Sequence, residues 1–249
     1  MESEIRILIL EDVPTDAELA ERELRKAGIR FTSRRADSRE AFLGGLREFR
    51  PDVILADYSL PRFNALEALR LARSERPDTP FILVTGSQGE EVAVALIREG
   101  VDDYLLKSSL KRLPTALLNA LKRKESEKAH RRFTAIFEAT TDFVGMTDAE
   151  GRAVYLNRGA RRMVGLGEDE DIQGFSVAEG HPAWARPLFH EAIRMAVRDG
   201  VWQGETALLR RDGREIPVSQ VIMAHKASDG TVEFFSSVAR DITEIKRAD

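Results

Sequence analysis

Four apolar segments in the first half of the chain end in charged or hydroxyl side chains. The segments are Ile5–Leu10, Val53–Ala56, Phe81–Val84 and Tyr104–Leu106. Near-continuous apolar runs of this length are typical of strands in a parallel sheet that is covered on both faces. The side chains that directly follow them are Glu11 with Asp12, then Asp57, Thr85 and Lys107. Because parallel strands bring their carboxyl ends to one edge, we expect these side chains to form one site.

Helical patterns alternate with these strands. A second strand is expected at Phe31–Ala36, and helices are expected from Pro14 to the cap at Gly28, over Ser38–Phe49, Ala65–Glu75 and Glu90–Arg98, and again from about Leu110. Pro51 follows the second of these helices and cannot continue it. Five β-α repeats in a row predict an α/β domain with a doubly wound, five-stranded parallel sheet.

The second half of the chain has shorter elements and more turns. Expected strands are Phe143–Thr147, Ala153–Asn157, Gly204–Leu209, Ile216–Ala224 and Val232–Asp241, and expected helices are Gly159–Val164 and Ala185–Arg198. The turns Asp148–Gly151, Asp212-Gly213 and Asp229-Gly230 are typical of antiparallel hairpins. We therefore expect an α+β domain in which helices pack on one face of an antiparallel sheet.

A helical connector is expected between the two domains. Helix formers dominate residues 111–137, which divides the chain into a first domain at 1–123, a connector at 124–137 and a second domain at 138–249. Leu113, Leu117, Leu118 and Leu121 have the spacing of a short helical pairing between two protomers, as in a homodimer. A solvated helix with one amphipathic end explains the same residues, so both interpretations stay open.

Composition narrows the functional classes. The 249 residues carry a formal net charge of −4, so we expect neither nucleic acid nor an anionic membrane as partner, because both favour a basic surface. The absence of cysteine excludes disulfides and thiolate chemistry and fits a reducing compartment. No apolar stretch approaches the roughly 20 residues that span a bilayer, and the N-terminus lacks a signal-peptide pattern. A cytoplasmic location is the expectation.

The grouped carboxylates predict a metal site. Glu11, Asp12 and Asp57 would repel one another at one sheet edge unless a hard divalent cation neutralised them, and Mg²⁺ is the natural candidate. A carboxylate beside that ion can act as nucleophile toward a phosphoryl group. Lys107 would supply a positive charge for the transferred group, and the hydroxyl of Thr85 a hydrogen-bond donor.

The same residues resemble the receiver domains of two-component response regulators. The resemblance rests on Glu11-Asp12, Asp57-Tyr58-Ser59-Leu60-Pro61, Val84-Thr85-Gly86 and Asp103-Tyr104-Leu105-Leu106-Lys107. It implies that Asp57 accepts a phosphoryl group from a histidine kinase or phosphotransfer protein. It also implies that Asp12, Asp57 and the backbone carbonyl of Ser59 bind Mg²⁺, that Glu11 assists through water, and that Thr85 and Tyr104 act as the conformational switch.

Two positions depart from the receiver pattern. Receivers usually have a proline after the lysine, often with a cis bond, whereas Ser108 follows Lys107 here. A cis bond before a non-proline residue costs about 3 kcal/mol, so a trans loop is expected. Asn64-Ala65 stands where receivers commonly have glycine, and a positive φ at that place would strain the alanine, so another path of the loop after Asp57 is expected.

The second half resembles a PAS domain. The resemblance rests on Thr147-Asp148-Ala149-Glu150-Gly151, Tyr155-Leu156-Asn157, Arg210-Arg211-Asp212-Gly213 and Ala239-Arg240-Asp241-Ile242-Thr243-Glu244. It implies ligand sensing or dimerisation without naming the ligand, and an outgoing helix after Asp241-Ile242-Thr243. Without cysteine, flavin photoadduct chemistry is excluded.

Several aromatic residues of this domain have two interpretations each. His181 and His190 are candidate axial ligands for haem, although a surface or capping role is the simpler interpretation of each. Trp202 and Phe175 could line a small cavity or belong to an ordinary core.

Together these patterns predict a two-component signalling protein, a phosphoacceptor rather than a turnover enzyme. Phosphorylation of Asp57 would be relayed through the connector to the PAS domain. Two alternatives stay open: the N-terminal input part of a sensor histidine kinase or other signalling enzyme, and a binding scaffold that is never phosphorylated. A phosphatase with an aspartate nucleophile fits less well, because Ser59 stands where its second aspartate is needed.

Overall fold

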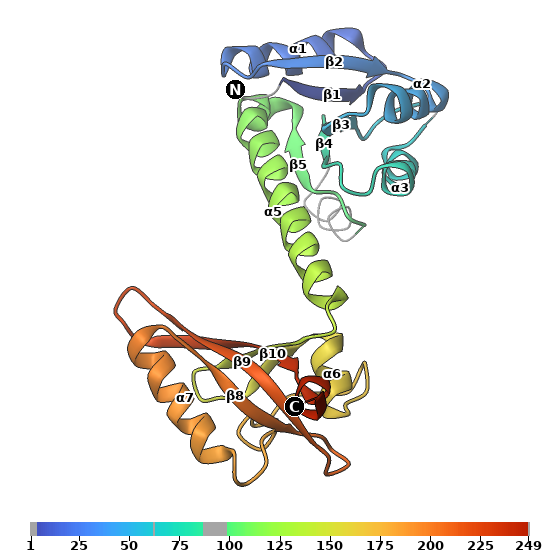
Figure 1. Ribbon diagram of the computed structural model, residues 1–249. Helices are drawn as coiled ribbons and strands as arrows, with labels where there is room; N and C mark the ends of the chain where they lie inside the picture. Colours follow the sequence, from blue (N-terminus) through green and yellow to red (C-terminus); the bar gives the residue numbers. More distant parts are fainter. Residues whose placement is uncertain (1–3, 62, 87–98, 249) are drawn as a thin grey trace. The chain divides into compact units, whose positions relative to one another are not determined.

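The computed structural model describes residues 4–61, 63–86 and 99–248 (Figure 1). The chain forms two compact units, Met1–His130 and Arg131–Asp249, and each is described by itself. Within the described residues, no helix is long and apolar enough to span a membrane.

The first unit is built on the predicted five-stranded parallel sheet. Its strands are β1 (Ile5–Leu10), β2 (Phe31–Ala36), β3 (Val53–Asp57), β4 (Phe81–Thr85) and β5 (Asp103–Leu106). Their order in the sheet is β2-β1-β3-β4-β5, and all neighbours are parallel. The register places Leu10 beside Ala56, Asp57 beside Val84, and Thr85 beside Leu106. The strands therefore end level with one another, and this is the edge that the sequence indicated.

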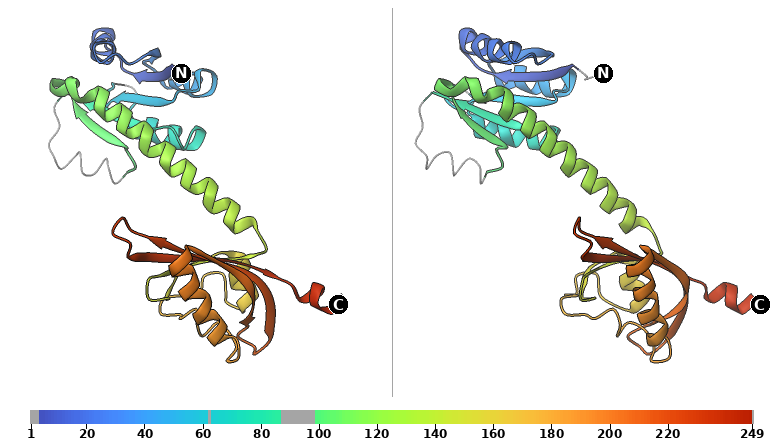
Figure 2. Two further views of the ribbon diagram at one scale, coloured as in Figure 1. Left: turned by 60° about the vertical axis from the view of Figure 1, so that its left-hand side comes forward. Right: turned by 90° about the vertical axis from the view of Figure 1, so that its left-hand side faces the viewer.

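Helices cover both faces of this sheet, as a doubly wound fold requires (Figures 1 and 2). They are α1 (Pro14–Lys26), α2 (Arg39–Gly44), η1 (Gly45–Phe49), α3 (Ala65–Glu75), η2 (Lys107–Arg112) and α5 (Leu113–Ala139). One core cluster joins α2 and α3 to the sheet, and a second joins α1 and the first turns of α5 to the other face. The helix expected at Glu90–Arg98 lies outside the described residues.

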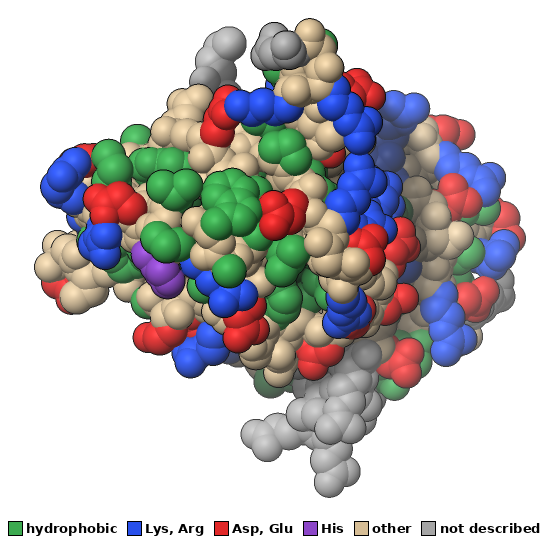
Figure 3. Space-filling model, turned by 60° about the horizontal axis from the view of Figure 1, so that its bottom comes forward, with side chains coloured by type: hydrophobic (Ala, Val, Ile, Leu, Met, Phe, Trp, Pro, Cys, Tyr) green, Lys and Arg blue, Asp and Glu red, His purple; other side chains and the backbone are tan. Residues whose placement is uncertain are grey.

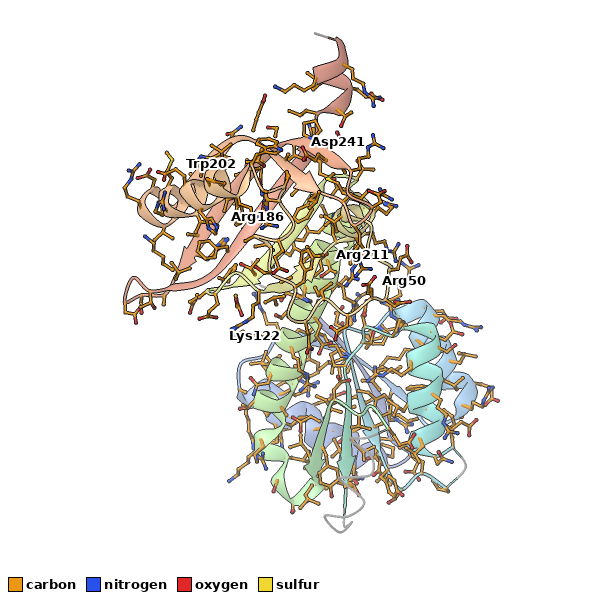
Figure 4. All side chains as sticks on the ribbon, turned by 90° about the horizontal axis from the view of Figure 1, so that it is seen from below. Arg50, Lys122, Arg186, Trp202, Arg211 and Asp241 are labelled. Atoms are coloured by element: carbon orange, nitrogen blue, oxygen red, sulfur yellow. The ribbon has the colours of Figure 1, made fainter. Side chains whose placement is uncertain are left out.

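Two predicted helices differ in detail from those observed. The helix expected over Ser38–Phe49 is α-helical only as far as Gly44, and η1 continues it as a π-helix. Pro51 disfavours the helical conformation for the residue before it. That residue, Arg50, is labelled in Figure 4 and takes the left-handed φ of 50° and ψ of 65°. The last helix begins at Leu113 rather than Leu110, because a 3₁₀ segment precedes it.

The loops at the two departures from the receiver pattern are unstrained. Asn64 has φ −76° and caps α3, accepting a hydrogen bond from the Glu67 N–H at 2.8 Å. Ala65 is simply the first helical residue, so glycine is not needed at this place. The peptide bond between Lys107 and Ser108 is trans, as expected without proline.

The second unit is the predicted antiparallel sheet with helices on one face. Its strands are β6 (Phe143–Asp148), β7 (Ala153–Leu156), β8 (Val201–Leu209), β9 (Glu215–Lys226) and β10 (Val232–Asp241), in the order β7-β6-β10-β9-β8. The helices are α6 (Arg158–Val164), α7 (Arg186–Asp199) and the short terminal α8 (Thr243–Ala248).

Alternating residues of β9 explain why both longer helices lie on the same face. Ile216 and Val218 pack in the cluster that contains α6, and Ile222 packs in the cluster that contains α7. These residues are an even number of positions apart, so their side chains point to one side of the sheet. Trp202 packs against the α7 cluster from β8 (Figure 4).

Candidate functional site

The predicted site residues of the first unit converge at the carboxyl edge of the parallel sheet. Glu11 and Asp12 follow β1, and Asp57 is the last residue of β3. Carboxylate oxygens of these three residues lie within 4.8 Å of one another. Glu11 and Asp57 are 5% and 7% exposed, so two of the three charges are held away from water.

Lys107 joins the strands at this edge through its ammonium group. Its Nζ lies 2.8 Å from Glu11 Oε2, 3.1 Å from Asp57 Oδ2 and 2.6 Å from Asp16 Oδ2. The side chain starts in η2 directly after β5, so the parallel register delivers it to the acidic cluster. One cation is thus shared by three carboxylates from β1, β3 and α1.

The electrostatics follow from burial and crowding. Burial raises the pKa of Glu11, and the neighbouring charge of Asp57 adds to this, although Lys107 opposes it. Burial alone would lower the pKa of Lys107, but its hydrogen bonds to Asp16, Glu11 and Asp57 raise it well above its usual value. The amine therefore stays charged at neutral pH.

This donor set fits a hard divalent cation. Mg²⁺ prefers carboxylate oxygens at 2.0–2.1 Å, keeps several waters and binds substrate phosphates. Glu11, Asp12 and Asp57 are the single group of three or more potential metal-ligating side chains within the part of the chain that the structure describes. Burial is the main cause of the raised pKa of Glu11 and the charge of Asp57 a smaller one, and a bound cation would offset both.

The two predicted switch residues occupy different environments. Thr85 is fully buried at the end of β4, and its Oγ1 has no hydrogen-bond partner. A buried hydroxyl without a partner is costly, so Thr85 is poised to bond an additional group at the site. Tyr104 lies in β5, partly buried, and packs against the core cluster on the α3 side of the sheet.

Backbone groups complete the site. The N–H of Ser59 donates to Asp57 Oδ1 at 3.3 Å, and the N–H of Val13 donates to Glu11 Oε1 at 3.1 Å. Both hydrogen bonds fix the orientation of a carboxylate at the carboxyl end of its strand. Arg35, from β2, donates to the backbone carbonyl of Glu11 at 2.9 Å.

Sequence reasoning missed Asp16 and Arg35. Asp16 lies in the first turn of α1 and is the nearest of the three carboxylates to Lys107. Its position one helical turn after the acidic pair was an available indication. Arg35 carried no comparable indication, because its role depends on the pairing of β2 with β1.

The residues that were given two interpretations in the second unit have different environments in the structure. His190 is exposed, as a surface residue would be, but the surface interpretation is wrong for His181, which is 2% exposed. Phe175 lines a cavity together with His181. Trp202 instead belongs to the packed cluster around α7.

The comparisons with known families agree with this geometry. Residues 7–118 match the family model of the response regulator receiver domain, and residues 137–247 match the model of the PAS fold. The chain therefore contains a receiver domain followed by a PAS domain. Receiver domains typically bind Mg²⁺, and the acidic cluster is present here.

Curated relatives are regulatory proteins. The chain is 33% identical to the probable transcriptional regulatory protein TcrX of Mycobacterium tuberculosis, over 41% of this chain and 43% of that protein. It is 33% identical to the DNA-binding response regulator MtrA of Mycolicibacterium smegmatis, over 50% of this chain and 54% of MtrA. The cell cycle transcriptional regulator CtrA of Caulobacter vibrioides is 28% identical over 62% and 64%. The chain thus spans between 43% and 64% of these relatives' lengths.

The names of these relatives bear on the expectation, drawn from net charge, that nucleic acid is not a partner. MtrA is named as a DNA-binding protein, so the relatives lend no support to the expectation that this chain has no nucleic-acid partner. That property belongs to MtrA as a whole protein.

Solved structures resemble each unit separately. The receiver domain of a LuxO repressor protein from Vibrio parahaemolyticus is 23% identical and covers 51% of this chain and 97% of its own, with a TM-score of 0.46. A PAS domain from Colwellia psychrerythraea is 21% identical and covers 47% of this chain and 98% of its own, with a TM-score of 0.43.

Proposed function

We propose that the chain is a phosphoacceptor of a two-component system, phosphorylated on Asp57. The observation that carries this proposal is the contact of Lys107 Nζ with both Asp57 and Glu11, beside the third carboxylate of Asp12. A nucleophilic carboxylate, acidic ligands for a cation and a fixed positive charge are the parts that phosphoryl transfer to aspartate requires.

Each residue has a role in the proposed transfer. A carboxylate oxygen of Asp57 attacks phosphorus of a phosphohistidine, an acyl phosphate bond forms, and the phosphorus–nitrogen bond breaks as the protonated imidazole leaves. Lys107 stabilises the charge on the transferred group. Asp12, Asp57 and the Ser59 carbonyl would hold Mg²⁺, with Glu11 acting through water, and the ion would supply further charge neutralisation. The phosphodonor would be a histidine kinase or phosphotransfer protein.

The buried hydroxyl of Thr85 would then report the modification. Its Oγ1 lacks a partner, and a phosphoryl oxygen on Asp57 would provide one at the end of the neighbouring strand. Tyr104, on the strand beside it, would repack when Thr85 moves. We propose that this change is relayed to the PAS domain by way of α5.

Acetyl phosphate provides the test. We expect the full chain, incubated with acetyl phosphate and Mg²⁺, to gain the mass of one phosphoryl group, and we expect Asp57→Asn to gain none. Asp52→Asn is a matched control, since Asp52 pairs with Arg6 away from the cluster. Equal masses for the parent and Asp57→Asn would support the binding-scaffold alternative and overturn the proposal.

The leucine pairing expected from the sequence is wrong for Leu113 and Leu117, because both are fully buried in the core of the first unit. We propose instead that α5 mediates dimerisation through its later turns. Phe133 and Ile136 are 62% and 64% exposed, which is unusual for large apolar side chains three residues apart on one helix. A second copy of the same helix would cover them. Ile136→Glu should shift the molar mass measured by light scattering from dimer toward monomer, whereas Arg132→Glu, at a polar exposed position, should not. An unchanged mass for Ile136→Glu would exclude this interface.

A further inference from the structure

The PAS unit contains a cavity of about 200 Å³ between its sheet and the helical layer. Most of its lining is apolar, with large contributions from Phe143, Leu156, Phe175, Phe189, Ile222 and Phe235. A dry cavity of about 150 Å³ can hold benzene, whereas drug-sized ligands occupy roughly 300–1,000 Å³. The volume therefore suits a molecule of about one six-membered ring with a small substituent.

One side chain of the lining has an unmet hydrogen-bonding need. His181 is 2% exposed and stacks on Phe189 with ring centroids 4.2 Å apart. Its Nδ1 lies 2.8 Å from the backbone carbonyl of Val177, but its Nε2 is buried and has no hydrogen-bond partner. An unsatisfied buried polar atom costs about 1–3 kcal/mol, so its presence beside a cavity points to an occupant.

The tautomer of His181 can be assigned from its contacts. A carbonyl oxygen can only accept, so Nδ1 must carry the proton that it shares with Val177. Burial lowers the pKa of His181 and keeps the ring neutral, and the nearby charge of Arg186 works in the same direction. Nε2 is then the unprotonated nitrogen, whose lone pair accepts a hydrogen bond.

Gln220 and Ser237, which also line the cavity, already have hydrogen-bond partners. The Oγ1 of Thr206 donates to Gln220 Oε1 at 2.6 Å, and Gln220 Nε2 donates to the Oγ of Ser237 at 2.9 Å. The amide of Gln220 interacts with the imidazole, while its oxygen and one of its N–H groups are engaged in these bonds. Nε2 of His181 remains a buried acceptor without a hydrogen-bond partner in a residue that lines the cavity.

We propose that this cavity binds a compact, uncharged aromatic molecule that carries one O–H or N–H donor, and that the donor bonds to Nε2 of His181. The apolar lining would exclude water from the ring, and the imidazole would orient the donor. The phosphoacceptor chemistry at Asp57 does not require this site, so the inference goes beyond the proposed function.

A metal-bound cofactor fits these residues less well. A histidine whose Nδ1 donates to a carbonyl is also a common metal ligand. The cavity of about 200 Å³ is, however, below the roughly 300–1,000 Å³ that larger ligands occupy. Over the described ranges, His181 also belongs to no group of three or more potential ligating side chains that could hold a metal ion alone. An organic donor satisfies Nε2 without further ligands.

Phenol and toluene form a matched pair for the test, because they differ only in a hydroxyl in place of a methyl group. Isothermal titration of the full chain should show phenol binding at least about tenfold more tightly than toluene, the usual effect of one buried hydrogen bond. Nitrogen NMR should show His181 Nε2 as an unprotonated nitrogen whose shift changes when phenol is added. Equal affinities for the two compounds would overturn the proposal. No binding of phenol would do the same, and is the result expected if ordered water satisfies Nε2.

Two variants test whether the preference for phenol depends on His181. His181→Phe keeps the ring stack but removes the acceptor, so it should bring the two affinities within about twofold. His225→Phe is the matched control, since His225 stacks on Phe234 outside the cavity lining and should keep the preference for phenol. If His181→Phe does not fold, the proposal is still tested on the parent chain, by its ratio of phenol to toluene affinity and by the change in the nitrogen NMR shift of His181 when phenol is added. Asp57→Asn should bind phenol normally, which separates this result from failure of the phosphoacceptor proposal.

Discussion

At the scale of single residues, Lys107 determines the electrostatics of the receiver site. Three carboxylates lie within 3.1 Å of its ammonium group, and one of them is that of the proposed nucleophile Asp57. A fixed charge in a partly buried site acts on the transition state far more strongly than one in water.

Lys107→Ala should therefore slow phosphorylation without abolishing the acceptor. We expect the uptake of phosphate from acetyl phosphate to fall by roughly 10²-fold, the usual effect of removing one stabilising group. A time course of intact mass measures this rate. Lys111→Ala, an exposed lysine in the same η2 segment, should leave the rate unchanged, and equal rates for the two variants would contradict the assigned role.

Asp102 is a second residue whose environment the structure explains. Burial would raise the pKa of Asp102, but the N–H of Phe81 and the side chains of Arg73 and Lys124 outweigh it and hold the pKa below its usual value. The Arg73 contact is 2.6 Å and the Phe81 hydrogen bond 2.8 Å. Asp102 thereby connects α3, β4 and α5.

This shift has a defined consequence for stability against pH. The pKa of Asp102 in the folded protein is depressed. The stability that its charged form contributes is therefore present above the pKa of the unfolded chain, near 3.9, and is lost as the pH falls through the pKa of the folded protein. Asp102→Asn should lower the free energy of unfolding at pH 7 by about 2 kcal/mol, and by less in acid. Urea titrations at several pH values measure this difference. Glu75→Gln, which breaks an exposed pair with Arg47, should have a smaller effect.

At the scale of elements, the two adjacent glycines at the junction of α2 and η1 have different surroundings. Gly44 and Gly45 both have helical φ angles, −58° and −60°. A Cβ on Gly44 would meet nothing within 4 Å, whereas one on Gly45 would lie 2.6 Å from Leu8 Cδ1 in the core. The second glycine therefore lets the helix approach β1 closely.

The two alanine variants should consequently have opposite effects. Gly44→Ala should stabilise the receiver domain by up to about 1 kcal/mol through helix propensity. Gly45→Ala should destabilise it by roughly 1–3 kcal/mol, because Leu8 is fully buried and must move. Thermal unfolding of the two variants checks the signs, and a stabilised Gly45→Ala would show that the core yields easily.

Elements also differ in how well the pattern of residues predicted them. β2, α3 and β10 have the predicted bounds, because each ends at a glycine, proline or polar turn. The ends of α2 and the start of α5 were less accurate. Both contain non-α turns, and a π or 3₁₀ turn has no distinct hydrophobic period.

At the scale of the whole molecule, each of the two units has its own hydrophobic core, which indicates two folding units. In the described residues, two core clusters lie on the two faces of the parallel sheet, and two others lie between the antiparallel sheet and its helices. Acidic and basic side chains are interspersed on the face shown in Figure 3, as is common for folded surfaces.

We expect calorimetry of the full chain to show two unfolding transitions. Mg²⁺ should raise the midpoint of one and phenol the midpoint of the other, because a ligand stabilises the unit that binds it. The Gly45→Ala substitution should lower the Mg²⁺-sensitive midpoint and leave the other in place. A single transition that both ligands shift together would show that the two units unfold as one.

The amino-acid sequence by itself determined the fold of both units and the members of the acidic site. Apolar strands, turn residues and the groups that end each strand are local features, and parallel topology then requires the ends to meet. Only the tertiary structure revealed Asp16 and Arg35 as partners of that site, and the unpaired nitrogen of His181 beside a cavity. Those properties depend on which distant side chains share a space and which hydrogen bonds remain unmade, and no local pattern of residues encodes them.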